Sequence, residues 1–292
     1  MKKNCSIFYK AFLMVKSNPL VSIAMSVFNA EQTIGESLNS LINQTYENIE
    51  ILIMDDGSTD NTKDILKKYQ KIYPKIKLFE NNGNIGLTKS LNILISKSEG
   101  EIIARQDSDD ISMINRIEIQ MKTLYEENLD FCTSRALIMN TKKKIPGLSF
   151  YISPKKLIRY KNPFIHGTLL IKKPLLSKIG FYNESFKFAQ DYKLFSDLLS
   201  IDCRFKNINE PLYQLNMEDN ISSNLKEAQN YYAKCVRKKI DPIDLNERAK
   251  GTLDYDINMH LQSREISSSL DRHLRHWGDC ESLDAVCQRS GS

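Results

Sequence analysis

The sequence predicts an α/β fold in which helices flank a mostly parallel β-sheet. Apolar runs rich in β-branched residues alternate with stretches whose apolar residues recur at helical spacing over residues 20–106. Such alternation is typical of parallel strands joined by crossover helices. The 292 residues are 41% hydrophobic and 26% charged, which suits one large globular domain with an appendage.

The first half of the chain contains the clearest elements. Four apolar runs are predicted strands: Leu20–Asn29, Ile49–Ser58, Lys75–Glu80 and Glu101–Gln106. Three amphipathic stretches between them are predicted helices: 31–43, a helix capped by Thr59 or Asp60 with Ile65, Tyr69 and Ile72 as its apolar stripe, and one from Leu87 that ends before Gly100. Strand, helix and strand therefore follow one another in the order that a parallel sheet requires.

The second half adds weaker elements and a change of character. The predictions are a helix lined by Ile114, Ile117, Met121 and Leu124, a strand at Leu129–Met139, a basic turn at 141–147, a basic linker or short helix at 154–161, a strand at Thr168–Ile171, a helix that begins near Asp191, and a strand over 203–216. Apolar residues become scarce after about Glu218. We therefore expect an N-terminal extension (1–18), a main domain (19–217) and a partly disordered helical appendage (218–292).

Charge and cysteine content restrict the class of protein. The net charge is +5, and basic residues are interleaved with acidic ones over most of the chain, so no nucleic-acid-binding stripe is predicted. An excess of Lys favours anionic partners, such as sugar nucleotides or an anionic membrane surface. Six cysteines without a C-x-x-C pair indicate a reduced, cytoplasmic protein. For residues 5–19 two interpretations stay open: an amphipathic helix packed on the domain, or a peripheral contact with the inner membrane.

Polar clusters follow three of the predicted strands: FNAE at 28–31, DDGS at 55–58 and DSDD at 107–110. Ligands of open parallel sheets bind beyond the carboxyl ends of the strands, so we expect these clusters to converge. Asp107, Asp109 and Asp110 crowd three carboxylates into four residues, and a divalent cation such as Mg²⁺ or Mn²⁺ would relieve their repulsion. The alternative for this motif alone is an ordinary polar turn.

Six segments together resemble the family 2 glycosyltransferases of the GT-A fold, which has a Rossmann-like sheet. In order they are VSIAMSVFNAE, ILIMDDGSTDNT, NIGLTKSLN, GEIIARQDSDD, HGTLLIKK and FAQDYKLFSDLL, within Pro19–Tyr213. The similarity is greatest to bacterial enzymes that build O-antigen, capsule or other surface polysaccharide. Ser26 stands where the family usually has Pro, a difference of backbone shape that should be tolerated. The Q-x-x-R-W motif and membrane spans of processive members are missing from the sequence, which implies transfer of single sugars.

The resemblance implies roles for individual residues. Those implied to bind the nucleotide-sugar are Val27, Asn29, Glu31, Asp56, Lys89, Arg105, Asp107 and His166. Asp109, with Asp107, is the implied metal ligand, and Asp110 either ligates or orients its neighbours. Asp191 is the implied catalytic base, because an acceptor hydroxyl must lose its proton as it attacks. Gln190 beside it is expected to bond the acceptor sugar.

Simpler interpretations remain open for several of these residues. Arg105 either contacts the donor phosphates or forms a salt bridge at the end of its strand. His166 either bonds a phosphate or metal or is a satisfied structural histidine, and Lys89 either approaches the nucleotide or lies on a solvated helix face. Asp191 either acts as the base or caps its helix. Asp55 is expected to fix its loop.

The predicted activity is metal-dependent, inverting transfer of one sugar from a nucleotide-sugar, for which we expect a UDP-sugar. The expected acceptor is a lipid-linked saccharide at the inner face of the bacterial membrane. A sugar-1-phosphate nucleotidyltransferase is the first alternative, but those enzymes carry a Gly-rich, Arg-containing loop where this chain has SVFNAEQT. A non-catalytic nucleotide-sugar-binding module is the second, and the presence of Asp109 and Asp191 argues against it.

Overall fold

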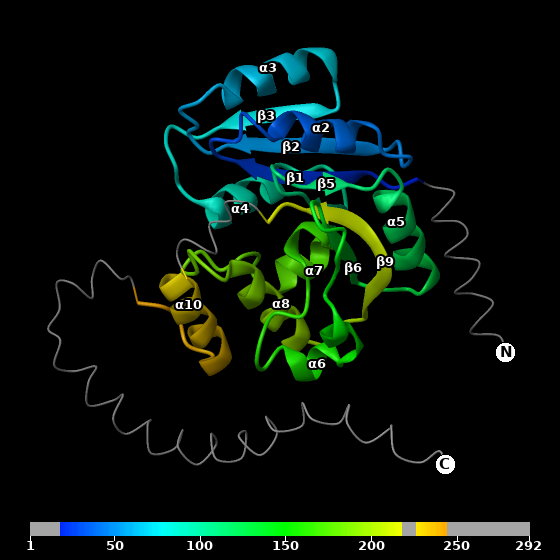
Figure 1. The fold of residues 1–292 in the computed structure, drawn as a ribbon, viewed down its shortest axis with the longest axis vertical. Helices are drawn as coiled ribbons and strands as arrows, with labels where there is room; N and C mark the ends of the chain where they lie inside the picture. The colour runs from blue at the N-terminus through cyan, green and yellow to red at the C-terminus, as the bar shows by residue number, and fades with distance from the viewer. Residues whose placement is uncertain (1–17, 218–225, 244–292) are drawn as a thin grey trace, which may run out of the picture. The chain divides into compact units, whose positions relative to one another are not determined.

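The computed structural model describes residues 18–217 and 226–243, which form an α/β domain around one mixed sheet (Figure 1). The predictions for the N-terminal extension and for most of the appendage lie outside the described residues. The division of the chain at 18/19 and 217/218 stays a prediction. No helix among the described residues is both long enough and apolar enough to cross a bilayer.

The strands run in the spatial order β3-β2-β1-β4-β8-β6-β9-β5, and β7 pairs with β6. Their bounds are β1 Val21–Val27, β2 Ile49–Asp55, β3 Ile76–Glu80, β4 Ile102–Arg105, β5 Ile111–Ser112, β6 Phe131–Ile138, β7 Lys144–Ile145, β8 Leu170–Lys172 and β9 Phe205–Leu215. β3, β2, β1 and β4 are mutually parallel. β8 is antiparallel to β4 and β6, β9 is parallel to β6, and β5 is antiparallel to β9. The predicted mostly parallel sheet is therefore confirmed.

Helices cover both faces of this sheet. The helices are α2 Ile34–Ile42, α3 Thr62–Ile72, α4 Leu87–Lys97, α5 Arg116–Glu126, α6 Pro154–Leu157, α7 Lys173–Lys178, α8 Gln190–Ser200 and α10 Lys226–Lys238, with 3₁₀ turns η1 Leu148–Tyr151 and η2 His166–Thr168. Leu38, Leu66 and Met121 pack on one face, and Leu91, Leu176 and Phe195 pack on the other.

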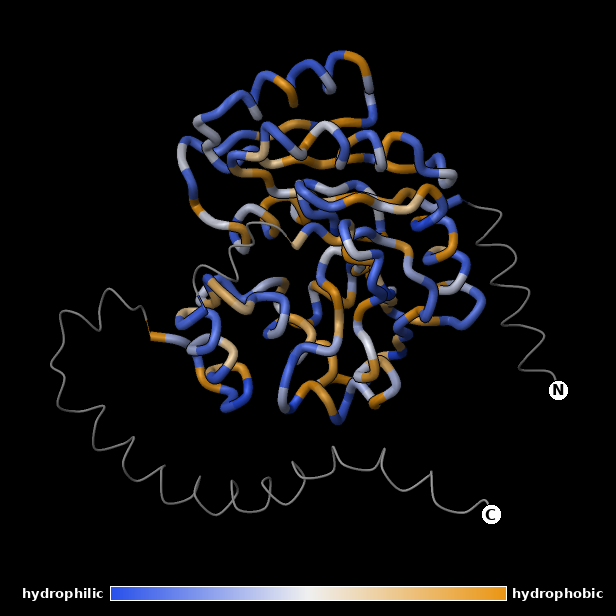
Figure 2. The backbone as a smooth tube through the Cα atoms, viewed as in Figure 1, coloured by the Kyte–Doolittle hydropathy of each residue, from blue (hydrophilic) through white to orange (hydrophobic). Residues whose placement is uncertain are grey.

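The central strands are buried on both sides, which explains their continuous apolar runs. In β1, Val21, Ile23 and Met25 belong to the core beneath α2, α3 and α5, whereas Ala24 belongs to the core beneath α4 and α8. Figure 2 shows these strands as orange stretches between helices whose outer faces are blue. A strand that must be apolar on both faces loses the alternating pattern of a half-exposed strand. The sheet interior was therefore readable from the sequence.

Some predicted details are wrong. Ile72, assigned to the apolar stripe of its helix, is 67% exposed, and Leu66 is the fully buried apolar residue of α3. The inner face of α3 is set by Thr62 and Leu66, one turn apart, so Ile72 lies off that face. Ile114 is 60% exposed and precedes α5, and Thr168 lies in η2 before the strand that begins at Leu170.

α10, which belongs to the predicted appendage, packs against the main domain. Its Tyr232, Cys235 and Val236 form a small apolar cluster with Phe186 and with Tyr192 of α8. The rings of Phe186 and Tyr232 meet edge to face, with centroids 6.0 Å apart. This contact fixes α10 beside the helix that carries Asp191.

Candidate active site

The carboxyl ends of β2, β1 and β4 lie side by side and bring the three polar clusters together. Val27 is paired with Asp55, and its carbonyl accepts a hydrogen bond from the backbone N–H of Asp56 at 2.8 Å. On the other side of β1, Ala24 is paired with Arg105. The Ser37 hydroxyl of α2 donates to the carbonyl of Asp107 at 3.0 Å. The predicted convergence of FNAE, DDGS and DSDD is therefore seen at one edge of the sheet.

Residues of the FNAE cluster hold the loop that follows β2. The Asn29 side-chain oxygen accepts from the backbone N–H of Thr59 at 2.8 Å, and Glu31 accepts from the backbone and side-chain nitrogens of Asn61 at 2.9 and 2.8 Å. Val27 is fully buried in the core, so its side chain is not available to a ligand. A contact between Val27 and the nucleotide would therefore come from its backbone, and that contact stays a prediction; its carbonyl accepts the N–H of Asp56.

The two acidic residues of DDGS both stabilise loops. A carboxylate oxygen of Asp55 accepts the backbone N–H of Ser58 at 3.0 Å, in agreement with its expected role in fixing the loop. Asp56 is buried, and its oxygens accept from the Asn81 amide at 2.7 Å and from the backbone N–H groups of Ile85 and Gly86 at 3.0 and 2.9 Å. Asp56 thus anchors the segment before α4, and direct contact between Asp56 and the nucleotide stays a prediction.

The DSDD turn concentrates negative charge. Asp107 and Asp109 are half-buried and Asp110 is buried. Burial, together with the charge of Asp107, raises the pKa of Asp109. Burial and the charges of Asp107 and Asp109 raise the pKa of Asp110 to about 8. These shifts reflect the repulsion that a divalent cation would relieve.

The carboxylates of the turn are not equivalent as ligands. Asp110 accepts the backbone N–H of Asn216 at 2.7 Å and is also bonded by Tyr213, so it supports the turn from behind. Within residues 18–217 and 226–243, no three acidic, His or Cys side chains form a ready metal cage. Mg²⁺ and Mn²⁺ are commonly held by one or two carboxylates, with substrate phosphates and water completing the shell. Asp109 and the second oxygen of Asp107 fit that arrangement.

For Arg105, the structure supports the second interpretation, a salt-bridged residue at the end of its strand. Arg105 is 2% exposed, and its guanidinium bonds a carboxylate oxygen of Asp107 at 2.5 Å and the carbonyl of Ala24 at 3.3 Å. This pairing supports the salt-bridge interpretation, and direct contact with a donor phosphate stays a prediction. Arg105 compensates part of the charge of the turn.

Arg116 and Tyr213 are structural elements of the site that the sequence predictions missed. Arg116 is fully buried on α5, and one of its terminal nitrogens donates to the carbonyls of Arg105 at 3.0 Å and Gly167 at 2.6 Å. The Tyr213 hydroxyl accepts the backbone N–H of Asp107 at 3.0 Å, and the Arg116 guanidinium lies 5.3 Å from the Tyr213 ring. The available signal was an Arg on the apolar side of a predicted helix, directly before Ile117.

His166 lies between the DSDD turn and α8. Its Nε2 is 2.7 Å from the hydroxyl of Tyr182. Burial and the nearby positive charge of Arg105 lower the pKa of His166 to about 4, whereas the charges of Asp107 and Asp191 act in the opposite direction. The same three charged groups act on Tyr182, whose pKa is raised by burial. Asp107 and Asp191 therefore both lie within electrostatic reach of a neutral His166.

Asp191 is held at the start of α8. One carboxylate oxygen accepts from the Asn162 amide at 2.7 Å, and the other accepts the backbone N–H of Tyr192 at 2.7 Å. The N-cap position is occupied by Ala189, with φ 50°, so the alternative that Asp191 is the N-cap is wrong. Gln190 is half-buried beside Asp191, and Lys89 is exposed on α4; their predicted contacts with acceptor and nucleotide stay predictions.

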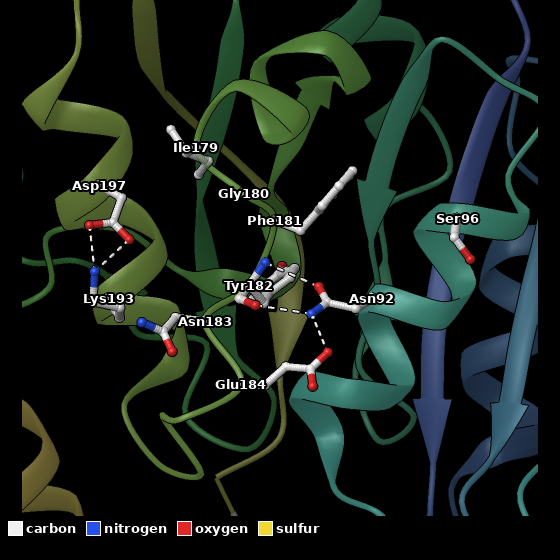
Figure 3. A pocket seen from close by; sticks show the side chains of 10 residues that line it. All are labelled: Asn92, Ser96, Ile179, Gly180, Phe181, Tyr182, Asn183, Glu184, Lys193 and Asp197. Atoms are coloured by element: carbon white, nitrogen blue, oxygen red, sulfur yellow. Dashed lines mark hydrogen bonds and ion pairs between the residues drawn. The ribbon is translucent and has the colours of Figure 1, made fainter. Parts of the chain in front are cut away.

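A hollow of about 690 Å³ lies between α4, α8 and the loop 179–184 (Figure 3). The residues predicted to act in catalysis or binding do not line it. Its polar groups are largely paired with one another. The Asn92 side chain donates to the carbonyl of Tyr182 and to the Glu184 carboxylate, and its oxygen accepts the N–H of Tyr182. Lys193 bonds Asp197. The hollow touches the candidate site through Tyr182, which Asn92 positions against His166.

The chain is similar to several known proteins. A family model described as Glycosyl transferase family 2 matches residues 22–182. Escherichia coli WfgD, named a UDP-Glc:alpha-D-GlcNAc-diphosphoundecaprenol beta-1,3-glucosyltransferase, is 33% identical over 64% of this chain and 74% of its own. The O-antigen biosynthesis glycosyltransferase WbnJ of Escherichia coli is 31% identical over 73% of this chain and 85% of its own.

A solved structure shares the fold. The mannosyltransferase PcManGT from Pyrobaculum calidifontis, solved with GDP-Man and Mn²⁺, superposes with a TM-score of 0.62 over 81% of this chain and 74% of its own. Its sequence identity of 18% limits this likeness to the fold.

Proposed function

Because this chain belongs to glycosyltransferase family 2, and is a GT-A enzyme with relatives in surface polysaccharide synthesis, we propose that it moves one sugar from a UDP-sugar to a saccharide acceptor with inversion. The observation that supports the proposal is that the charges of Asp107 and Asp191 both act on His166, which is bonded to Tyr182. The proposed donor-side carboxylate and the proposed base are therefore both close enough to influence one histidine. Family membership sets aside both the nucleotidyltransferase and the non-catalytic alternative.

The donor side is assigned to the edge formed by β2, β1 and β4. The name of WfgD includes UDP-Glc, and this supports a UDP-sugar here. Asp109 and Asp107 would hold Mn²⁺ or Mg²⁺, whose charge, when bound, would offset the charge of the departing nucleoside diphosphate. Asp56 and Asn29 hold the loops that would surround the nucleotide, while Arg105 and Arg116 fix the backbone of the metal turn.

Asp191 is proposed to remove the acceptor proton. The acceptor oxygen forms a bond to the anomeric carbon, the bond to the diphosphate oxygen breaks, and the proton passes to Asp191. The Asn162 amide holds one oxygen of Asp191, so the carboxylate is oriented before the acceptor arrives. A neutral His166, paired with Tyr182, can hydrogen-bond a sugar hydroxyl without adding charge beside the base.

The acceptor is proposed to be a lipid-linked saccharide. Support comes from the name of WfgD, which gives a sugar attached to diphosphoundecaprenol as acceptor. Such an acceptor has a diphosphate and a long apolar chain, so it would meet the protein at a membrane surface.

A donor panel tests the proposal. UDP-, GDP- and dTDP-sugars, each with and without Mn²⁺, are scored for slow hydrolysis and for protection against thermal unfolding. We expect protection and hydrolysis with a UDP-sugar only when Mn²⁺ is present, and loss of both in Asp109→Ala. Asp202→Ala is the control, because it removes an exposed carboxylate remote from the predicted residues in sequence. Equal behaviour of the two variants, or full activity in chelator, would contradict the metal assignment.

A further inference from the structure

The middle of the chain carries a one-sided charge distribution. Residues 131–183 contain eleven Lys and Arg and no Asp or Glu, although the net charge of the whole chain is only +5. Seven of the eleven fall within residues 142–161. This segment is an exception to the interleaving of charges predicted for most of the chain. A segment rich in cations and lacking carboxylates of its own favours an anionic partner.

The same segment exposes large apolar side chains. Leu148 is 88% exposed, Tyr151 74%, Tyr160 67% and Ile152 48%. Leu148 and Tyr151 are the first and last residues of η1, and residues three apart lie on the same face of a 3₁₀ turn. Four large apolar side chains exposed within residues 148–160 favour contact with a partner over exposure to water.

The turn is held in place from beneath. The Arg135 guanidinium of β6 lies 4.9 Å from the Phe150 ring, and the Phe150 and Tyr151 rings meet edge to face at 5.4 Å. Phe150 is thus anchored to the sheet. Leu148 and Tyr151 are therefore presented by a fixed turn. Around α6, apolar and polar stretches alternate along the chain (Figure 2).

This segment borders the candidate site at both ends. Near its start, β7 pairs with β6, whose last residue Ile138 is paired with Leu215. The next residue, Asn216, donates its N–H to Asp110 of the metal turn. Directly after the segment, the Asn162 amide bonds the proposed base Asp191. A partner bound along 142–161 therefore lies beside the acceptor side of the site.

We propose that residues 142–161, here called the 142–161 surface, dock the enzyme on an anionic phospholipid bilayer. Lys and Arg side chains bind anionic headgroups, and Leu and Tyr side chains enter the interfacial layer. Nucleic acid would match the charge but leave Leu148 and Tyr151 in water. A second copy of the chain would bring the same positive charge against itself. The combination of both chemistries favours a bilayer.

Vesicle sedimentation of the full chain tests this proposal. The probes are phosphatidylcholine vesicles with and without phosphatidylglycerol. Two variants alter the surface: Leu148→Ser/Tyr151→Ser removes apolar contact, and Lys142→Gln/Lys143→Gln/Lys144→Gln removes charge. Lys67→Gln/Lys68→Gln/Lys71→Gln on α3 removes the same charge from another face. These side chains lie outside the residues assigned to donor, metal or base.

We expect the wild type to bind anionic vesicles and to bind phosphatidylcholine alone at least about tenfold more weakly, as expected for several basic residues at the surface. Each 142–161 variant should lose about tenfold or more in binding, whereas the α3 control should change by less than about twofold. Donor hydrolysis should be unchanged in all of them, so failure here is distinguishable from failure of the proposed function.

Several outcomes would overturn the proposal. The wild type could fail to bind anionic vesicles, or bind neutral ones equally well. The 142–161 variants could bind like the wild type, or the α3 control could lose as much binding as they do. A dimer in analytical ultracentrifugation that Leu148→Ser/Tyr151→Ser abolishes, without vesicle binding, would assign the surface to a second copy. Circular dichroism melting of every variant verifies that each is folded.

Discussion

The guanidinium of Arg116 joins two segments that carry predicted site residues. It donates to the carbonyl of Arg105, which precedes the DSDD turn, and to the carbonyl of Gly167, which follows His166. The group is fully buried, and among the described residues its Nε and its other terminal nitrogen have no partner. Burial lowers the pKa of Arg116 to about 10. A charge kept in this costly position points to a positioning role.

Replacing Arg116 tests that role. In Arg116→Met, we expect Mn²⁺ in the presence of UDP to bind about tenfold more weakly. The reason is that the backbone before the DSDD turn loses the hydrogen bond that Arg116 donates to it. Arg116→Lys should lie between Met and the wild type. Binding can be measured from the electron paramagnetic resonance signal of free Mn²⁺.

The sign of the Arg116 effect is informative. Removing a positive charge close to Asp107 and Asp110 would, by electrostatics alone, tighten cation binding. Weaker binding in Arg116→Met therefore reports lost geometry, and unchanged or tighter binding would contradict a positioning role.

His166 predicts a pH dependence of stability. Its pKa is lowered to about 4 in the folded protein, whereas an unfolded His titrates near 6.5. As the pH falls below about 6.5, His166 is protonated in the unfolded state but not in the folded state. Its contribution to the unfolding free energy is therefore fully present above pH 6.5 and is lost progressively as the pH falls to about 4. The unfolding free energy of the wild type should fall between pH 7 and pH 5. In His166→Gln this fall should be smaller by about 1–2 kcal/mol, because the titrating group has been removed. Urea unfolding at both pH values measures the difference, and parallel losses would show that the pKa of His166 is not lowered in the folded protein.

At the level of elements, the loops that follow the strands are stabilised by hydrogen bonds to one another as well as by the strands. Asn29 and Glu31 bond the loop after β2, and Asp56 bonds the segment before α4. Gly57 has φ +80°, and a Cβ there would lie 2.7 Å from the backbone of Gly83. Two loops therefore touch at a point that only glycine fits.

Gly57→Ala should destabilise the protein by about 2 kcal/mol or more, because it combines an unfavourable φ with a backbone clash. Gly83→Ala is the matched control, since a Cβ at Gly83 meets nothing within 4 Å. Urea unfolding midpoints compare the two. Equal midpoints would mean that the loops do not make this contact.

The sequence predicted the elements better than their contacts. β1, β2 and β4 were readable because strands buried on both faces are continuously apolar, and α4 because Leu91, Leu94 and Ile95 keep helical spacing. Ile65 and Tyr69 pack against the core as predicted, but the burial of Ile72 was misjudged, because several apolar residues fit the spacing of α3 and the sheet covers only one face of it. The strand order of the mixed half of the sheet could not be predicted, because β8 and β5 are too short to show a period.

The candidate site was predicted unevenly for a related reason. Acidic clusters at strand ends are visible in a sequence, so Asp56, Asp107 and Asp109 could be predicted as site residues, whereas Asp191, at the start of a helix, was predicted from the family resemblance. Arg116, Tyr213, Tyr182 and Asn162 act through partners far away in the chain, and a sequence period carries no record of such pairs. Motif position also does not reveal that the side chains of Val27 and Arg105 are buried.

At the scale of the whole molecule, the two halves of the sheet have different tasks. The parallel half, β3-β2-β1-β4, presents the acidic clusters assigned to the donor. The mixed half carries His166, Asn162 and α8, assigned to the acceptor. Arg116 and the β4–β8 pairing connect the halves. The proposal therefore depends on Asp191, carried by the mixed half, lying close to the donor that is proposed to bind at the parallel half.

The most direct test of this account is the rate of sugar transfer by Asp191→Asn, measured with the active UDP-sugar and a saccharide–diphosphate–lipid acceptor. Asn keeps the size of the side chain but cannot take a proton. We predict a fall in turnover of at least about a hundredfold, with Mn²⁺-dependent UDP binding unchanged. Near-normal turnover of Asp191→Asn with intact donor binding would contradict the assignment of the catalytic base and the shared site on which it depends.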